Sequence, residues 1–297
     1  MKLINHYPYD RNSAPLTSCM PNCVHDAITM LAPRHFTVLT GAGVSTDSGI
    51  PDYRGPGAPV RAPITYEEFV SGEANRQRFW ARSYIGFSRM LRAEPNASHR
   101  ALARLETAGR VTLLITQNVD CLHERAGSRS LCALHGRITG VRCLSCGHQS
   151  SRIALQERMR LLNPDLDYLK APVSARPDGD AELEKADGFC VPSCEMCSGI
   201  LKPDIVFFGE NVPKDRVQCC YKAVEAGEAL LVVGSSLTVL SGFQFVRYAH
   251  KLGIPIVIVN RGNTRGDDLA TYKADMDCAD FLNKLIRAVA HETSRHI

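Results

Sequence analysis

The fold is decided by the stretch Thr40-Gly-Ala-Gly-Val-Ser-Thr-Asp-Ser-Gly-Ile-Pro-Asp-Tyr-Arg54. It follows Phe36-Thr-Val-Leu39, a short apolar run that predicts a buried strand. Gly41 and Gly43 can take positive φ and carry no Cβ, so a phosphate can approach the bare backbone N–H groups of the turn. The stretch therefore predicts a dinucleotide-binding loop, although an ordinary tight strand-to-helix turn needs glycine just as much.

The second half of the stretch favours a ligand over a plain turn. Ser45, Asp47 and Ser48 can cap and turn the backbone, while Ile50-Pro-Asp-Tyr-Arg54 places a rigid proline beside an acid, an aromatic ring and a cation. This pattern resembles the cofactor loop of the sirtuins, which are NAD-consuming protein-lysine deacylases. The resemblance implies that NAD contacts Gly41, Ala42, Gly43, Ser45, Asp52, Tyr53 and Arg54.

Composition is that of a large globular protein. The chain has 297 residues, 44% of them hydrophobic, a net charge of +4 and no dense Lys/Arg run, which argues against nucleic acid as a direct partner. The longest apolar stretch, 229–243, is broken by glycine and serine and predicts no membrane span. Twelve cysteines without the apolar core of a signal peptide favour a reducing compartment. The cytoplasm is the expected location, with the mitochondrial matrix as the alternative.

Buried strands alternate with helical patterns along the chain. Val111-Thr-Leu-Leu-Ile-Thr116 follows a helical pattern at 97–109 and is nearly all apolar, as an interior parallel strand should be. Similar strands are expected in 229–237 and 256–262, and residues 66–91 have helical spacing. We therefore predict an α/β fold: a Rossmann-like parallel sheet with helices on both faces, formed by residues 1–142 and 201–297. A helical insertion is expected at about 55–95 and a small zinc-binding module at 143–200.

Polar residues follow several of these strands, at the edge where open α/β sheets bind ligands. Gln117-Asn-Val-Asp120 comes directly after the second strand, although a turn with a helix cap explains it as well. The sirtuin resemblance implies that Gln117, Asn118 and Asp120 contact the nicotinamide ribose and carboxamide, and that Asn118 is catalytic. It adds these cofactor contacts at later strand ends: Gly234, Ser235, Ser236, Asn260, Arg261, Gly262 and Cys278.

His135 is a lone histidine, and such residues are commonly structural. Its place in Leu134-His-Gly136, between the Gln-Asn-x-Asp segment and a cysteine pair, resembles the catalytic His-Gly of sirtuins. Imidazole titrates near neutrality and can take a proton from a ribose hydroxyl. By resemblance, the acyl oxygen attacks the nicotinamide ribose and expels nicotinamide, and His135 then activates a ribose hydroxyl.

Two Cys-x-x-Cys pairs form the second strong signal. Four thiolates at Cys143, Cys146, Cys194 and Cys197 suit a tetrahedral zinc site with no open position, so the metal is expected to be structural. A redox Cys-x-x-Cys is the alternative. Cys190 lies four residues before Cys194 and could compete as a ligand, although the sirtuin pattern selects Cys194 and Cys197.

The segment Lys202-Pro-Asp-Ile-Val-Phe-Phe-Gly-Glu-Asn211 is rich in β-forming residues. Taken alone it predicts another core strand. In sirtuins this segment pairs with the extended substrate peptide. By that match the carbonyl of Val206 accepts a hydrogen bond from the acyl-lysine amide, and the peptide cleft is lined by Phe208, Gly209, Glu210 and Asn211.

The resemblance covers five motifs in the family's order, from about residue 36 to 285. Tyr53, the Arg-Pro-Asp-Gly-Asp segment at 176–180 and Thr264-Arg-Gly-Asp-Asp268 resemble the class II branch, which includes many bacterial enzymes and the fourth mitochondrial sirtuin of animals. The loop 55–61 is shorter than in the animal members. A monomeric NAD-dependent protein-lysine deacylase is expected, with one zinc per chain.

Two other functions use the same site: mono-ADP-ribosyl transfer to protein, and silent sensing of NAD or ADP-ribose. Sirtuins that prefer acidic acyl chains carry a Tyr-x-x-Arg pair. None of the nine tyrosines here is followed by arginine three residues on. Acetyl or longer apolar acyl groups are therefore expected, unless Arg61 or Arg82 enters the pocket.

Overall fold

A six-stranded parallel sheet forms the larger part of the computed structural model, which describes residues 21–53, 63–164 and 188–295. Its strands lie in the order β3-β2-β1-β7-β8-β9, and every neighbouring pair is parallel. Their bounds are β1 Phe36–Thr40, β2 Val111–Thr116, β3 Leu131–Ala133, β7 Ala229–Val233, β8 Ile256–Val259 and β9 Tyr272–Ala274.

The sheet changes its direction of growth at β1. From β1 the chain adds β2 and then β3 on one side, and β7, β8 and β9 are added on the other. Thr40, the last residue of β1, pairs with Thr116 of β2 and with Val233 of β7. The loops after these three strands therefore meet at the point where doubly wound sheets bind their ligands.

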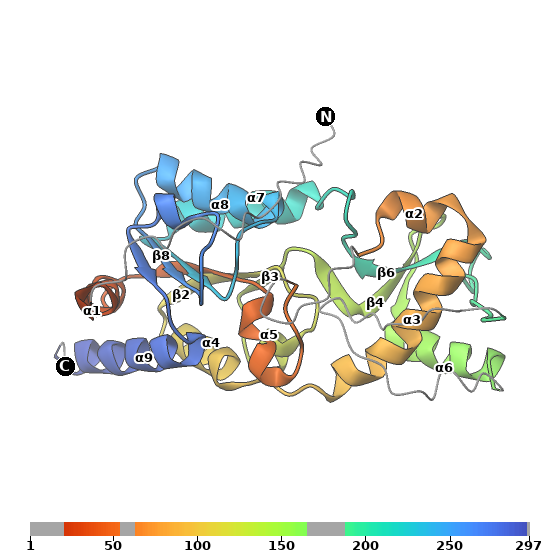
Figure 1. Cartoon of the computed structure of the whole chain (residues 1–297), viewed down its shortest axis with the longest axis horizontal. Coiled ribbons are helices and arrows are strands. Elements are labelled where there is room, and N and C mark those ends of the chain that lie inside the picture. The colour runs from red at the N-terminus through yellow and green to blue at the C-terminus, as the bar shows by residue number, and fades with distance from the viewer. Residues whose placement is uncertain (1–20, 54–62, 165–187, 296–297) are drawn as a thin grey trace.

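Helices cover both faces of this sheet (Figure 1). One layer contains α1 (Pro21–Leu31), α4 (Ala97–Thr107) and α9 (Cys278–Arg295), and the other contains α7 (Lys214–Ala226) and α8 (Leu240–Lys251). Successive strand residues point to opposite faces, so Val38 and Leu231 pack in the first layer and Leu39 and Leu230 in the second. The predicted parallel sheet with helices on both faces is confirmed.

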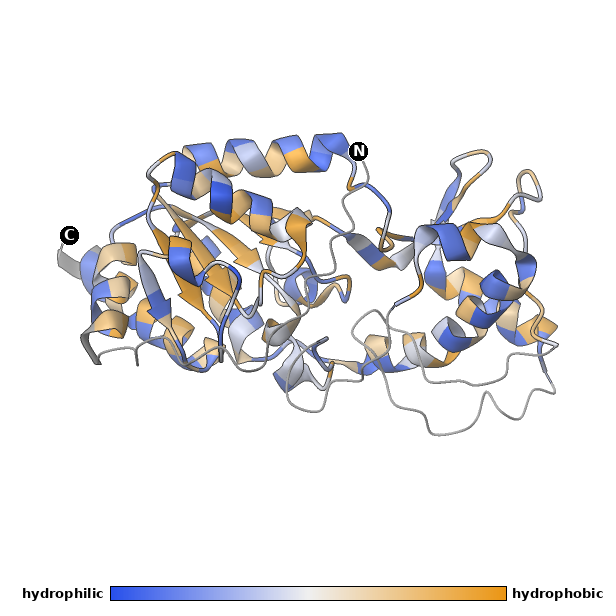
Figure 2. Cartoon of the chain, turned by 45° about the horizontal axis from the view of Figure 1, so that its top comes forward, coloured by the Kyte–Doolittle hydropathy of each residue, from blue (hydrophilic) through white to orange (hydrophobic). Residues whose placement is uncertain are grey.

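A second, antiparallel sheet of three strands has the order β5-β4-β6. Its core is aromatic: the rings of Phe69, Phe79 and Phe207 lie 5.2 to 5.3 Å apart. In Figure 2 apolar residues concentrate on the strands, and the helices alternate between apolar and polar. The elements here are β4 Gly136–Cys143, β5 Gln149–Ser151, β6 Leu201–Ile205, α2 Tyr66–Ser71, α3 Glu73–Arg92 and α6 Arg152–Leu162. A further short helix, α5 Leu122–Arg125, lies between β2 and β3 in sequence.

Arg152, the first residue of α6, ties that helix to α3. Its side chain is fully buried, with the guanidinium 4.3 Å from the ring centre of Phe87 and 5.2 Å from that of Trp80. It donates a hydrogen bond to the carbonyl of Ser83. Burial lowers the pKa of Arg152 to about 9, so the stacked rings and the α3 carbonyl hold a guanidinium that remains charged at neutral pH.

Some sequence predictions fall outside the described residues: Arg54, the loop 55–61 and the segment 176–180. The division into domains at residues 143 and 200 stays a prediction. Across the described ranges, no helix has both the length and the apolar composition needed to cross a membrane.

Candidate active site

The loop after β1 forms two short 3-10 turns, η1 (Ala42–Val44) and η2 (Thr46–Ser48). Gly41 has φ −136°, and neither Gly41 nor Gly43 has positive φ, so the loop does not use that freedom of glycine. Glycine is needed here for space. A Cβ on Gly41 would lie 2.8 Å from the Cβ of Ser235, and one on Gly43 would lie 2.9 Å from the carbonyl oxygen of Gly234.

The loop after β7 closes tightly against the first one. Gly234 does have positive φ, +59°, and a Cβ there would lie 2.5 Å from the backbone nitrogen of Val44. The Gly43 N–H donates to the Gly234 carbonyl at 2.9 Å, and the Gly41 N–H donates to the Val233 carbonyl at 3.2 Å. The predicted glycines of β1 and β7 thus form one packed surface.

Gln117 joins the loop after β2 to both of these loops. Its side-chain amide donates to the Ser235 hydroxyl at 2.9 Å and to the Thr40 carbonyl at 3.2 Å. Its backbone N–H donates to the same Thr40 carbonyl at 3.0 Å. The backbone carbonyl of Ser236, the residue after Ser235, accepts a hydrogen bond from the backbone N–H of Arg265. Gln117 therefore holds the ends of β1, β2 and β7 together.

Asn118, Ser45 and Asp120 share one hydrogen-bonded cluster. The Asn118 amide donates to the Ser45 hydroxyl at 3.0 Å and to the Gly41 carbonyl at 3.1 Å. The Ser45 hydroxyl donates to the carboxylate of Asp120 at 2.7 Å. Burial raises the pKa of Asp120, and hydrogen bonds from the Leu122 N–H and from Ser45 act in the opposite direction. The structure thus brings these three predicted residues together.

His135 lies between β3 and β4, close to the end of β2. Its Nδ1 is 2.9 Å from the Gln117 carbonyl oxygen, which can only accept, so Nδ1 carries the ring proton and Nε2 has a lone pair. The hydroxyl of Ser241 lies 2.8 Å from Nε2. Burial lowers the pKa of His135 to about 4, and the charge of Arg216 acts in the same direction. The imidazole is therefore neutral at pH 7 and able to accept a proton.

The segment predicted to bind the substrate peptide adjoins His135. β6 is a largely buried strand, as the composition predicted, and it pairs with β4 in the smaller antiparallel sheet. The Val206 N–H donates to the His135 carbonyl at 2.8 Å. Phe208 is 41% exposed, its carbonyl accepts the backbone N–H of Tyr66, and its ring meets that of Tyr53 edge to face at 6.5 Å.

Lys202 and Glu210 form an ion pair that shapes this segment. The Lys202 ammonium is 3.1 Å from the Glu210 carboxylate, and the lysine side chain is only 8% exposed. The same carboxylate accepts the Phe207 N–H at 2.9 Å. The lysine also donates to the backbone carbonyls of Pro203 and Ile205. Glu210 thus has an internal partner, while Gly209 next to it has positive φ, +80°.

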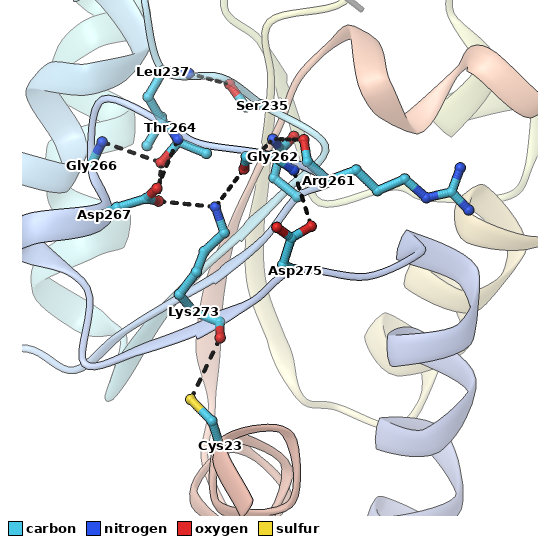
Figure 3. A network of polar contacts seen from close by, with 11 residues as sticks. Cys23, Ser235, Leu237, Arg261, Gly262, Thr264, Gly266, Asp267, Lys273 and Asp275 are labelled. Atoms are coloured by element: carbon cyan, nitrogen blue, oxygen red, sulfur yellow. Dashed lines mark hydrogen bonds and ion pairs between the residues drawn. The ribbon is translucent and has the colours of Figure 1, made fainter. Parts of the chain in front are cut away.

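The loop after β8 is held by a partly buried lysine (Figure 3). The Lys273 ammonium donates to the Gly262 carbonyl at 2.8 Å and to the carboxylate of Asp267 at 3.0 Å. Asp267 in turn accepts the backbone N–H and the hydroxyl of Thr264. The Gly262 N–H donates to Asp275 at 3.0 Å. These contacts fix the shape of the predicted Asn-Arg-Gly segment.

Arg261 connects that segment to the start of α9. Its guanidinium is 2.9 Å from the carboxylate of Asp277, and its side chain is 74% exposed. Asn260 donates its amide to the Arg261 carbonyl at 2.8 Å. Cys278 follows Asp277 as the first residue of α9, and burial raises its pKa to about 12. The Arg261–Asp277 ion pair therefore joins the loop after β8 to the residue before Cys278.

The four predicted cysteine ligands cluster in the smaller part of the molecule. The sulfur atoms of Cys143, Cys146, Cys194 and Cys197 all lie within 4.8 Å of one another. Tetrahedral Zn–S bonds of about 2.3 Å place neighbouring sulfurs roughly 3.8 Å apart. The cluster therefore fits a zinc ion, and the prediction is confirmed. Cys190 is outside it, with its sulfur 3.8 Å from the Gly188 carbonyl.

A family model described as Sir2 family matches residues 41–241, more than half of the chain. This chain belongs to the Sir2 family. The matched region includes the loop after β1, the Gln-Asn-x-Asp segment, His135 and all four clustered cysteines. The resemblance to sirtuins seen in the motifs is thus confirmed.

Curated relatives of this Sir2 chain are bacterial. "NAD-dependent protein deacetylase 1" of Mycobacterium avium (strain 104) is 52% identical over 260 residues, which cover 86% of this chain and 92% of the relative. "NAD-dependent protein deacetylase" of Bordetella bronchiseptica is 50% identical over 253 residues, covering 84% and 92%.

Solved Sir2 structures share the fold. A complex described as "Sir2-p53 peptide-NAD+" has a TM-score of 0.68 and 32% identity, covering 91% of this chain and 98% of that chain. A complex of Sir2 with the inhibitor EX-527, 2'-O-acetyl-ADP-ribose and deacetylated p53 peptide has a TM-score of 0.70 and 31% identity, covering 91% and 99%.

Sequence reasoning missed two buried histidines that contact Ser45 and Thr40 near the loop after β1. His99 of α4 is fully buried, with Nε2 3.5 Å from the Ser45 hydroxyl and Nδ1 3.0 Å from the Asn96 side chain. The ring centre of His123 lies 4.7 Å from that of His99, with the rings tilted by 58°, and its Nε2 is 3.0 Å from the Thr40 hydroxyl. Burial lowers the pKa of His99 to about 4 and holds the pKa of His123 well below its usual value. Asn96 and His99 have the spacing of a capping box, which could have placed the imidazole at a helix start.

Proposed function

We propose that this chain is an NAD-dependent protein-lysine deacylase that releases nicotinamide and transfers the acyl group to ADP-ribose. The observation that carries the proposal is a neutral imidazole, His135, with an Nε2 lone pair beside the loops of β1, β2 and β7. Relatives at about half identity are named NAD-dependent protein deacetylases, and a similar solved complex holds NAD and a peptide. The names of the relatives and the content of the solved complex both support this reaction.

In this proposal NAD binds along the carboxyl edge of the large sheet. The packed loops after β1 and β7 would lie against the phosphates, because they meet where the sheet changes its direction of growth. Gln117, Asn118, Ser45 and Asp120 would contact the nicotinamide ribose and the carboxamide, and the loop Asn260–Gly262 with Cys278 the adenosine. The proposed NAD contacts also include Asp52, Tyr53, Ala42, Ser235 and Ser236.

The acyl-lysine peptide would add as a strand beside the segment after β6. β6 is an edge strand of the three-stranded sheet, since β4 is its one partner strand among the described residues. An extended peptide can pair with such an edge through backbone hydrogen bonds. Val206 is bonded to the His135 carbonyl, so its strand lies next to the base. Phe208, with Gly209 to Asn211, would line the cleft.

His135 would act as a general base in the second stage, after nicotinamide has left. A neutral imidazole with Nδ1–H bonded to a carbonyl can take a ribose hydroxyl proton at Nε2. Water then completes the reaction, which yields lysine, nicotinamide and O-acyl-ADP-ribose. The zinc ion would be structural, because four cysteine ligands leave no open position for a substrate.

Peptide-dependent release of nicotinamide tests the proposal. The full chain is incubated with NAD and an acetyl-lysine peptide, and nicotinamide, free peptide and O-acetyl-ADP-ribose are measured by mass spectrometry, with the unacetylated peptide as control. We expect equal amounts of the three products with the acetyl-lysine peptide, and neither nicotinamide nor O-acetyl-ADP-ribose with the control. Tight NAD binding without release indicates a sensor. A protein gaining the mass of ADP-ribose indicates mono-ADP-ribosyl transfer.

We also propose that the acyl pocket prefers acetyl or longer, largely apolar groups such as lipoyl-type chains. The support is the absence of a Tyr-x-x-Arg pair, whose guanidinium would bind a carboxylate. On one peptide backbone, succinyl- and glutaryl-lysine should give kcat/KM values roughly tenfold or more below acetyl-lysine, since an unpaired buried carboxylate is costly. A panel that includes butyryl-, lipoyl- and biotinyl-lysine measures this. If succinyl-lysine were the best substrate, the proposed acyl preference would be wrong, while the deacylase function would still stand.

The remaining features are part of the same proposal: a class II member, monomeric, in the cytoplasm. The zinc cluster needs reduced thiols, which suits the cytoplasm.

A further inference from the structure

Ser241 contacts the imidazole of His135 from a different element of the fold. It is the second residue of α8, and its hydroxyl oxygen lies 2.8 Å from Nε2 of His135. Because Nδ1–H is already donated to the Gln117 carbonyl, Nε2 has a lone pair and the serine is the donor. Both ring nitrogens are therefore held, one by the end of β2 and one by the first turn of α8.

The first turn of α8 is held firmly in place. A Cβ on Gly242 would lie 2.4 Å from the side-chain oxygen of Gln117, so the turn packs directly on that residue. The Ser241 carbonyl accepts the amide of Gln244 at 2.8 Å, and Gln244 accepts the hydroxyl of Tyr221 from α7 at 3.0 Å. Further along α8, Phe245 is fully buried in the core. These contacts fix the position of the Ser241 backbone, and with it the position of its hydroxyl group.

We propose that Ser241 is a positioning residue for His135, holding Nε2 where it takes the proton of the substrate's ribose hydroxyl. This inference rests on the deacylase function proposed above. A hydroxyl suits the task because it can both donate and accept. It donates to Nε2 while the site is free of substrate. Because Nε2 has one lone pair, the serine turns its own proton away when the ribose hydroxyl donates there. Once the proton has moved from the ribose oxygen to Nε2, the same hydroxyl oxygen can accept the new N–H.

Replacing Ser241 by alanine would remove the partner of Nε2 in both states. A hydrogen bond to a charged group contributes more than one between neutral groups, so the loss falls mainly on the step that creates the imidazolium. Release of nicotinamide precedes that step and does not use the base. The two stages of the reaction should therefore respond differently, whereas a general disturbance of the site would slow both.

The test compares deacetylation with nicotinamide exchange in the full chain. In the presence of acetyl-lysine peptide, Ser241→Ala should lower kcat for deacetylation roughly tenfold or more. Exchange of labelled nicotinamide into NAD, and KM for NAD, should stay within about twofold of wild type. Ser241→Thr keeps a hydroxyl and should restore most of the rate. Tyr248→Phe, which removes a hydroxyl elsewhere on α8, is the matched control and should change neither rate.

A second readout does not depend on turnover. The ¹⁵N resonance of His135 Nε2 should be that of an unprotonated nitrogen at neutral pH, should shift in Ser241→Ala and should stay in place in Tyr248→Phe. An unchanged resonance with wild-type deacetylation, or an equal fall of deacetylation and exchange, would overturn the inference. If the wild-type chain releases no nicotinamide in the presence of peptide, the proposed function is wrong instead. The ¹⁵N resonance of His135 would still show whether Ser241 contacts Nε2.

Discussion

Deacetylation by His135→Ala should be slower than by the wild type by roughly 10²-fold or more, the usual loss when a general base is removed. The imidazole is the group that can take the ribose proton, since burial lowers its pKa to about 4 and the Gln117 carbonyl fixes its tautomer. NAD binding should persist, because the loops after β1 and β7 are held by their own backbone contacts. Nicotinamide exchange should also persist, since it precedes the proton transfer.

The measurement combines kcat for acetyl-lysine peptide with calorimetric titration of NAD and a thermal melt. His250→Ala is a matched control, because His250 is an exposed residue near the end of α8. It should leave kcat, NAD affinity and Tm unchanged. Near-normal deacetylation by His135→Ala, with an intact fold, would remove His135 from the proposed mechanism.

The large sheet was predictable because its sequence signals are local. β2 is a nearly all-apolar run followed by Gln117, and the structure places it at 111–116 as expected. The helix before it ends at Thr107, and Gly109, two residues on, has positive φ, +73°. The cysteine pairs were equally clear, because their two-residue spacing is a property of the chain itself. Each of these predictions needed only a few neighbouring residues.

The omissions concern contacts between distant segments. The sequence indicated that Gly41 can take positive φ, but it could not show the close approach of Ser235, 194 residues away in sequence, which leaves no room for a Cβ. The segment after Lys202 has the composition of any strand, and only the pairing with β4 reveals its sheet. Ser241 carries no motif, since its contact with His135 exists only once α8 is packed on Gln117.

The zinc cluster should account for much of the stability of the smaller part of the molecule. Structural zinc in small peptides binds with about 10 to 16 kcal/mol, while a whole domain is stable by roughly 5 to 15 kcal/mol. Cys143 ends β4 and is fully buried, and β4 pairs with β6. β6 leads to Val206, whose N–H bonds the His135 carbonyl. Loss of the metal should therefore loosen the strand that faces the substrate as well as the cysteines.

Cys143→Ala should accordingly lose its zinc, melt at a lower temperature or aggregate, and lose deacetylation together with folded structure. Metal content by mass spectrometry, circular dichroism and kcat measure the three effects. Cys190→Ala is the matched control: it removes an exposed thiol from the same part of the chain, outside the cluster, and should keep one zinc per chain. A zinc-free Cys143→Ala with wild-type Tm would mean that protein packing alone holds β4 and β6. Zinc loss in the Cys190 variant would instead place Cys190 among the ligands and contradict the assigned set.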